Sequence, residues 1–177
     1  MRVHARGSKN TIPDNIGGGG APLIQRAAGE DMTNGNDQDA LARIIGEFGA
    51  DSGTIHYRGA DGLLHLAASS AGMPDHVLAI IRTIPVGKGM AGLAVERGQA
   101  VNACNIQTDD SGDVRPGARA TAMAGAVVVP IFRGDEIIGA LGVANRTERV
   151  FSDEEIARLI AAGREIASQR GSAPASG

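Results

Sequence analysis

The sequence of 177 residues has little cysteine and few aromatic residues: one Cys, no Trp, one Tyr and three Phe. A single cysteine excludes an internal disulfide framework and any metal site built from several thiolates. Four aromatic rings offer little surface for stacking nucleic-acid bases. The formal net charge is −3, and Lys and Arg are scattered along the chain. We therefore expect no nucleic-acid partner and no anionic membrane surface as a partner.

Long apolar runs are missing as well. No run approaches the roughly 18 residues of a membrane-spanning helix, and the N-terminus lacks the apolar stretch of a signal peptide, so we expect a cytoplasmic protein. Residues 1–36 combine a basic start with four consecutive glycines and no apolar period. That composition is typical of a disordered tail; a basic docking arm is the alternative. We expect one folded domain over 37–170 and a frayed C-terminus over 171–177.

The domain is expected to be α+β. Apolar residues at helical spacing predict four helices, and short apolar or β-branched runs predict five strands. The expected helices cover 37–49, 74–83, a short stretch ended by Gly98, and 153–169; the expected strands cover 54–58, 63–69, 100–102, 126–132 and 136–145. Because the strands are grouped rather than alternating with helices, the sheet should be antiparallel, with helices segregated on its faces. A long polar loop follows the third strand.

Four segments carry a family resemblance. They read IPVGKGMAGLA at 84–94, VVVPI at 127–131, GDEIIGALGV at 134–143 and FSDEE at 151–155. In this order and spacing they resemble the GAF domain, a small-molecule sensing module, over about residues 38–168. The resemblance implies a central antiparallel sheet of five or six strands and a ligand cavity between one sheet face and the middle segment. It also implies frequent dimerisation through the terminal helices.

One enzymatic GAF subfamily, the free methionine-(R)-sulfoxide reductases, can be tested against these residues. By that resemblance its reactive Cys falls on Ala91, a second Cys on or near Arg119, and its acidic residues on Ala126 and Ala144. Reduction through a sulfenic acid and a resolving disulfide needs two thiols within reach of each other. The chain has Cys104 alone, so we expect no such activity.

The signature of cyclic-nucleotide GAF domains is matched only in part. Asn145, Arg146, Phe151, Asp153 and Glu154 resemble it, but Arg stands for Lys and the spacing is shorter. Arg does not simply replace a Lys that forms one directed ion pair. Bilin attachment is poorly supported too, because the middle of the chain has few aromatic residues.

The cavity that the resemblance implies suggests six ligand-binding residues. Cys104 follows an expected strand at the start of the polar loop, where a cationic neighbour would favour a reactive thiol; plain packing is the alternative for Cys104 and for Met123. His56 and His65 are expected on the sheet surface, without a third metal ligand. No catalytic constellation, metal set or cofactor is identified. The candidates are Cys104, Asp109, Arg115, Arg119, Met123 and Val128.

The leading hypothesis is a non-enzymatic sensor or regulatory binding module. An unidentified small molecule would order residues 103–124 and thereby bias a homodimer formed through the terminal helices, with output to a partner protein. The apolar faces expected on helices 38–48 and 153–169 motivate the dimer. Two alternatives stay open: a redox sensor that uses Cys104, and a structural dimerisation module whose cavity is filled by side chains.

Overall fold

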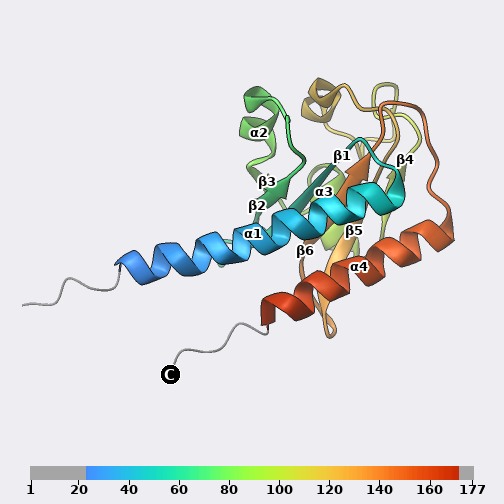
Figure 1. Ribbon diagram of the computed structural model, residues 1–177. Helices are drawn as coiled ribbons and strands as arrows, with labels where there is room; N and C mark the ends of the chain where they lie inside the picture. Colours follow the sequence, from blue (N-terminus) through green and yellow to red (C-terminus); the bar gives the residue numbers. More distant parts are fainter. Residues whose placement is uncertain (1–22, 172–177) are drawn as a thin grey trace, which may run out of the picture.

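A six-stranded sheet forms the centre of the computed structural model, which describes the backbone of residues 23–171 and the side chains of 35–171 (Figure 1). All neighbouring strands are antiparallel, in the order β3-β2-β1-β6-β5-β4. The expected α+β class and antiparallel sheet are confirmed. The strands are β1 (Ser52–Arg58), β2 (Leu63–Ser69), β3 (Thr83–Pro85), β4 (Val101–Ala103), β5 (Ala126–Arg133) and β6 (Glu136–Ala144).

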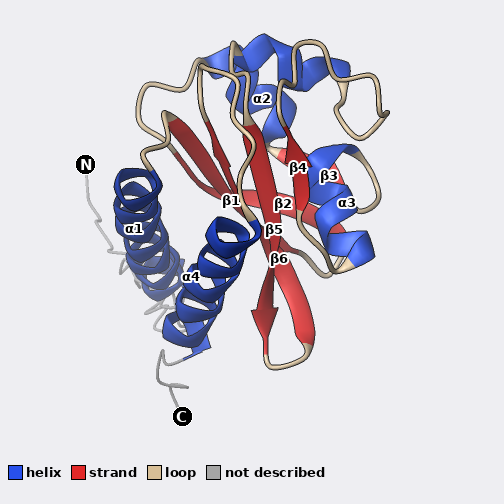
Figure 2. Ribbon diagram, turned by 90° about the vertical axis from the view of Figure 1, so that its right-hand side faces the viewer, coloured by secondary structure: helices blue, strands red, loops and turns tan. Residues whose placement is uncertain are grey.

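The helices cover two sides of the sheet. The long helices α1 (Leu23–Phe48) and α4 (Asp153–Gly171) lie side by side on one face (Figure 2). On the other side are α2 (Asp75–Ile81), α3 (Gly89–Arg97) and the 3-10 helix η1 (Pro116–Thr121). The expected helix 74–83 ends earlier, at Ile81, because Thr83–Pro85 pairs with β2 as the edge strand β3. Pro85 is tolerated there because an edge strand can lack one donor.

Helix α1 begins at Leu23 and thus extends into the segment 23–36 that was expected to belong to a disordered tail. The segment 23–34 contains Leu, Ala, Gln, Arg, Glu and Met, which favour helix, although it lacks an apolar period. Asp37, at the expected start of this helix, lies inside α1 with only 4% of its surface exposed. Residues 1–22 of the expected tail and 172–177 of the expected frayed end lie outside the described residues.

The main core lies between the sheet and the two long helices. Alternate strand residues such as Ile55, Val129 and Leu141 face this side, and they pack against α1 and α4 residues such as Ile44 and Leu159. The apolar faces of both helices are thus buried within the chain itself. Among the residues of either helix whose side chains are described, no exposed large apolar side chain is left, and the homodimer stays a prediction.

A buried polar cluster joins α1, β1 and α4. The Tyr57 hydroxyl donates to Asp37 Oδ1 at 2.9 Å, and Arg170 Nη1 lies 2.6 Å from Asp37 Oδ2. The Arg170 guanidinium also lies over the Tyr57 ring, 3.8 Å from its centroid. Each carboxylate oxygen of Asp37 thus has a donor, which meets the requirement for burying a charge.

This cluster predicts the alkaline behaviour of the protein. Burial, and then the Asp37 carboxylate, raise the pKa of Tyr57 well above its ordinary value of about 10. As the pH rises above about 10, the unfolded chain loses this proton and the folded chain keeps it, so the free energy of unfolding should fall. Because Tyr57 is the single tyrosine and Trp is absent, near-ultraviolet absorbance reports its ionisation alone. A phenolate midpoint near 10, with circular dichroism unchanged, would contradict the buried cluster; Tyr57→Phe should weaken the alkaline decline in stability.

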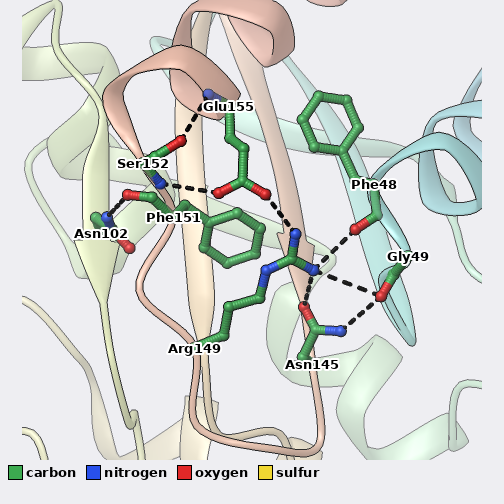
Figure 3. Close-up of polar contacts among 8 residues, drawn as sticks. All are labelled: Phe48, Gly49, Asn102, Asn145, Arg149, Phe151, Ser152 and Glu155. Carbon is green, nitrogen blue, oxygen red and sulfur yellow. Dashed lines mark hydrogen bonds and ion pairs between the residues drawn. The ribbon is translucent and has the colours of Figure 1, made fainter.

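A second polar network joins the end of α1 to the loop before α4 (Figure 3). Arg149 Nη1 donates to the Phe48 carbonyl oxygen at 2.8 Å and to Asn145 Oδ1 at 3.1 Å. Its Nη2 lies 2.6 Å from Glu155 Oε1, and Asn145 Nδ2 donates to the Gly49 carbonyl oxygen at 2.8 Å. The ion pair in this region is therefore made by Arg149 and Glu155, outside the partial cyclic-nucleotide signature.

Ser152 caps helix α4. The Glu155 N–H donates to Ser152 Oγ at 3.2 Å, and the Ser152 N–H donates to Glu155 Oε2 at 2.9 Å, the reciprocal arrangement of a capping box. The Ser152 N–H, followed by the Arg149 guanidinium, lowers the pKa of Glu155. The helix begins at Asp153, where the sequence predicted its start.

Candidate ligand-binding site

A cavity of about 490 Å³ lies on the side of the sheet away from α1 and α4. Its volume is within the range of small-molecule sites, roughly 300–1,000 Å³. β1, β5 and β6 supply one wall, and α2, α3 and η1 supply the opposite one. Side-chain alternation explains why β1 contributes to the sheet wall: because Ile55 faces the main core, its two neighbours on β1 face the cavity. The strand residues that line it include Ser52, Thr54, His56, Ala126, Val128, Gly142 and Ala144.

Small residues on the sheet keep the cavity open. A Cβ at Gly142 would lie 3.2 Å from the Val128 side chain and 3.5 Å from Thr54 Oγ1. Ala126 and Ala144 extend this surface of short side chains. A structural module with a filled cavity would need larger side chains here, so these residues do not favour that alternative.

The helices on the outer side of the cavity contact each other closely. A Cβ at Gly117 on η1 would lie 2.8 Å from Ile80 Cγ2 on α2, so glycine allows the two elements to meet. Ile80 is nevertheless 48% exposed. Gln107, in the polar loop, fixes the segment after η1, because its Nε2 donates to the Met123 carbonyl oxygen at 2.6 Å.

Three of the six predicted site residues line the cavity: Arg115, Met123 and Val128. Cys104, Asp109 and Arg119 lie outside its lining. Asp109 and Arg119 instead hold the polar loop together: Asp109 Oδ1 accepts from the Ser111 hydroxyl at 2.5 Å, and Arg119 Nη2 donates to the Asp109 carbonyl oxygen at 3.1 Å. These contacts are typical of local loop structure.

Cys104 is an exposed thiol. It directly follows β4, in which Val101 and Ala103 are buried and Asn102 is exposed. Alternation along this strand places the Cys104 side chain with Asn102, on the solvent side. The redox alternative therefore has no cavity around its thiol, and it stays a prediction.

His56 is the residue that the sequence analysis misplaced. Only 2% of it is exposed, and its Nε2 lies 2.9 Å from the Ile81 carbonyl oxygen. The register pairs His56 with Leu66 and His65 with Tyr57, which puts the two histidines on opposite faces of the sheet. The expected sheet-surface position holds for His65, which is exposed and contacts Asp61, and is wrong for His56. Alternation from Ile55 could have shown that His56 faces the predicted cavity.

Burial gives His56 a pH-dependent effect on stability. It lowers the pKa of His56 below the ordinary value of 6.5, more strongly than the bond to Ile81 raises it. Below about pH 6.5 the unfolded chain takes up this proton and the folded chain resists it, so the free energy of unfolding should decrease. In urea unfolding between about pH 5 and 7, His56→Gln should have a shallower acid decline than wild type, whereas His76→Gln, on the exposed surface of α2, should follow the wild-type slope. If the free energy of unfolding fell with the same slope toward acid pH in wild type and in both variants, buried His56 would not be the cause of the acid decline.

Within residues 35–171 no group of three or more His, Cys, Asp or Glu side chains is arranged to hold a metal ion. The helices described over residues 23–171 include none long and apolar enough to cross a membrane.

Comparisons with known proteins agree on the fold. Residues 38–168 match the sequence model of the GAF domain, and no curated protein matches the chain. One similar solved structure is a type II free methionine-R-sulfoxide reductase from Thermoplasma acidophilum, with 21% identity, a TM-score of 0.64, and coverage of 78% of this chain and 92% of that one.

Two others are GAF domains of phosphoenolpyruvate-protein phosphotransferases. The Coxiella burnetii domain has 19% identity and a TM-score of 0.66, covering 84% of this chain and 90% of its own. The Acinetobacter domain has 16% identity and a TM-score of 0.64, covering 88% and 98%. At these identities the likeness concerns the fold alone.

Proposed function

Because this chain belongs to the GAF domain family, we propose that it binds a small organic molecule in the cavity over β1, β5 and β6 and acts as a non-enzymatic sensor. GAF domains are commonly ligand-binding regulatory modules of signalling proteins. The proposed ligand contacts include Arg115, Met123 and Val128, a role supported by their place in the cavity lining. The proposed readout starts at α2 and η1, which meet over the cavity through Ile80 and Gly117. Output through a second copy or another protein stays a prediction.

The observation that carries this proposal concerns three alanines. Ala91, Ala126 and Ala144 occupy the positions where the resemblance places the reactive cysteine and the acidic residues of the reductase subfamily, and all three line the cavity. Alanine provides neither a nucleophile nor a proton donor. The cavity thus combines a binding volume with a lining that lacks those reactive groups, which supports binding without turnover.

Filling the cavity tests the proposal. Val128 is half-buried and lines the cavity from β5, so Val128→Phe should occupy part of the volume while keeping the strand apolar. Native mass spectrometry of full-length protein purified from its own host should detect a small-molecule adduct on wild type and none on Val128→Phe. Thermal unfolding is the control, since the variant should unfold within a few degrees of ligand-free wild type. Bare polypeptide mass in both proteins would argue against a ligand sensor.

A further inference from the structure

The cavity lining includes His56, whose ring has one buried hydrogen-bond acceptor without a partner. A carbonyl oxygen can only accept, so His56 Nε2 carries the hydrogen that is donated to Ile81, and Nδ1 of the neutral ring carries a lone pair. No group in the described part of the chain bonds to Nδ1, although the atom is buried. Unpartnered buried polar atoms are rare in folded proteins. His56 lines the cavity, so a molecule in the cavity is a natural source of the missing donor.

The charges around the cavity have one sign. Lys88 and Arg115 are its charged lining residues, and no Asp or Glu belongs to the lining. Neither cation makes an ion pair within residues 35–171. Both are exposed, which places their charges where the cavity meets solvent.

The start of α3 adds to this positive field. Lys88 is the residue before the first turn, and its side chain makes no capping bond. The Arg115 side chain lies against Gly89, where a Cβ would come within 3.2 Å of Arg115 Cδ. The positive end of the α3 helix dipole therefore lies close to the side chains of Lys88 and Arg115. The dipole and the two cations all favour binding of an anion.

Between these polar groups the lining is mostly apolar. Ile80, Met90, Met123 and Val128 contribute to it from four different segments. Methionine side chains adapt to ligands of irregular shape. An apolar ligand body would therefore be accepted without a strict shape requirement.

We propose that the cavity takes a small organic anion with an apolar body, whose hydroxyl or N–H group donates to His56 Nδ1 and whose anionic group faces Lys88 and Arg115. This inference rests on the proposed function and specifies its ligand class. His56 then acts as a specificity-determining residue: it rewards a ligand with a donor group over one without it. A ligand that lacks a donor leaves the buried His56 Nδ1 without a hydrogen bond and therefore binds more weakly.

Matched probes test each polar requirement separately. Isothermal titration of the full chain would compare 10-hydroxydecanoate with decanoate, which lacks the donor, and with 1,10-decanediol, which lacks the charge. Shorter homologues of all three extend the series, because a flexible chain adapts to the distance between His56 and the cations. We expect the hydroxy acid of best length to bind about tenfold more tightly than either analogue, the effect of one hydrogen bond to a buried group.

Variants assign each preference to its residue. His56→Phe should remove the advantage of the hydroxy acid over decanoate and leave decanoate binding unchanged. The double variant Lys88→Gln, Arg115→Gln should bind the hydroxy acid no more tightly than the diol. Arg146→Gln is the matched control, because this exposed cation lies outside the cavity lining and its contact to Asp51 uses the backbone N–H, and it should behave as wild type. If His56→Phe does not fold, the comparison of the hydroxy acid with decanoate on wild type still decides whether the ligand needs a donor group.

The outcomes separate this inference from the proposed function. Equal affinity of the hydroxy acid and decanoate for wild type, or an unchanged ratio in folded His56→Phe, overturns the ligand class while the sensor function stands. Equal affinity of the hydroxy acid and the diol for wild type overturns the requirement for an anionic group, and the sensor function again stands. No binding by any compound of the three series overturns the ligand class, while the sensor function is decided separately by the native mass spectrometry of wild type and Val128→Phe.

Discussion

Gly139→Ala is expected to destabilise the protein by about 3 kcal/mol or more. Gly139 lies on β6 between β1 and β5, where it pairs with Tyr57 and Ile131. A Cβ built at this position overlaps the His56 carbonyl oxygen, and a backbone atom in the middle of a sheet cannot move aside cheaply. For a domain of this size the melting temperature should fall by roughly 6–12 °C, measured by differential scanning calorimetry.

Gly46→Ala is the matched control for this substitution. Gly46 lies on the exposed side of α1, and a Cβ there meets nothing within 4 Å. Alanine favours helix over glycine, so this variant should be more stable by about 0.5–1 kcal/mol. If Gly139→Ala unfolded within about 0.5 kcal/mol of wild type, the close approach of β1 and β6 described here would be wrong.

Arg149→Ala should have the second largest effect, a loss of about 2–3 kcal/mol in the free energy of unfolding. The substitution removes the bonds to the Phe48 carbonyl oxygen, to Asn145 and to Glu155. It also removes the guanidinium from the face of Phe151, 4.3 Å from the ring centroid. The estimate is kept below that for a fully buried ion pair because a quarter of the Arg149 side chain is exposed.

Arg146→Ala separates this network from a general loss of positive charge. The neighbouring Arg146 is exposed, and its contact to Asp51 uses the backbone N–H, which alanine keeps. Urea unfolding should therefore place Arg146→Ala within about 0.5 kcal/mol of wild type. Arg149→Lys should lie between wild type and Arg149→Ala, because an ammonium group keeps the charge but cannot make the forked contacts. Equal effects of Arg146→Ala and Arg149→Ala would contradict the network.

The fold was largely predictable because its signals are local. Alternating apolar residues and an Asp61-Gly62 turn identify the β1–β2 hairpin, and Gly62 indeed has a φ of +78°. The early start of α1 was not predictable from periodicity, because the segment 23–34 has no apolar period. The burial of Asp37 was not predictable either, because it depends on contacts with Tyr57 and Arg170 from distant parts of the chain. The edge strand β3 was missed for a related reason: three residues carry no period, and their pairing with β2 defines them.

The site was predictable in part. Arg115, Met123 and Val128 were expected at the cavity that the family resemblance implies; they line the cavity, and their contact with a ligand stays a prediction. Cys104 was chosen for its chemistry, yet the strand alternation that makes it exposed was already visible in the sequence. His56 was missed because a histidine on a strand gives no sign of burial by itself; its burial depends on α2 closing over it through Ile81.

A methyl nuclear magnetic resonance titration with 10-hydroxydecanoate tests directly whether the cavity binds an organic anion. Met73, Met90 and Met123 line the cavity, whereas Ala167 is buried in the core on the opposite face of the sheet. We expect saturable shifts of the Met90 and Met123 methyl resonances, an unchanged Ala167 resonance, and loss of the shifts in Val128→Phe. Unchanged methionine resonances, or shifts that persist in Val128→Phe, would contradict the proposed organic-anion site in this cavity.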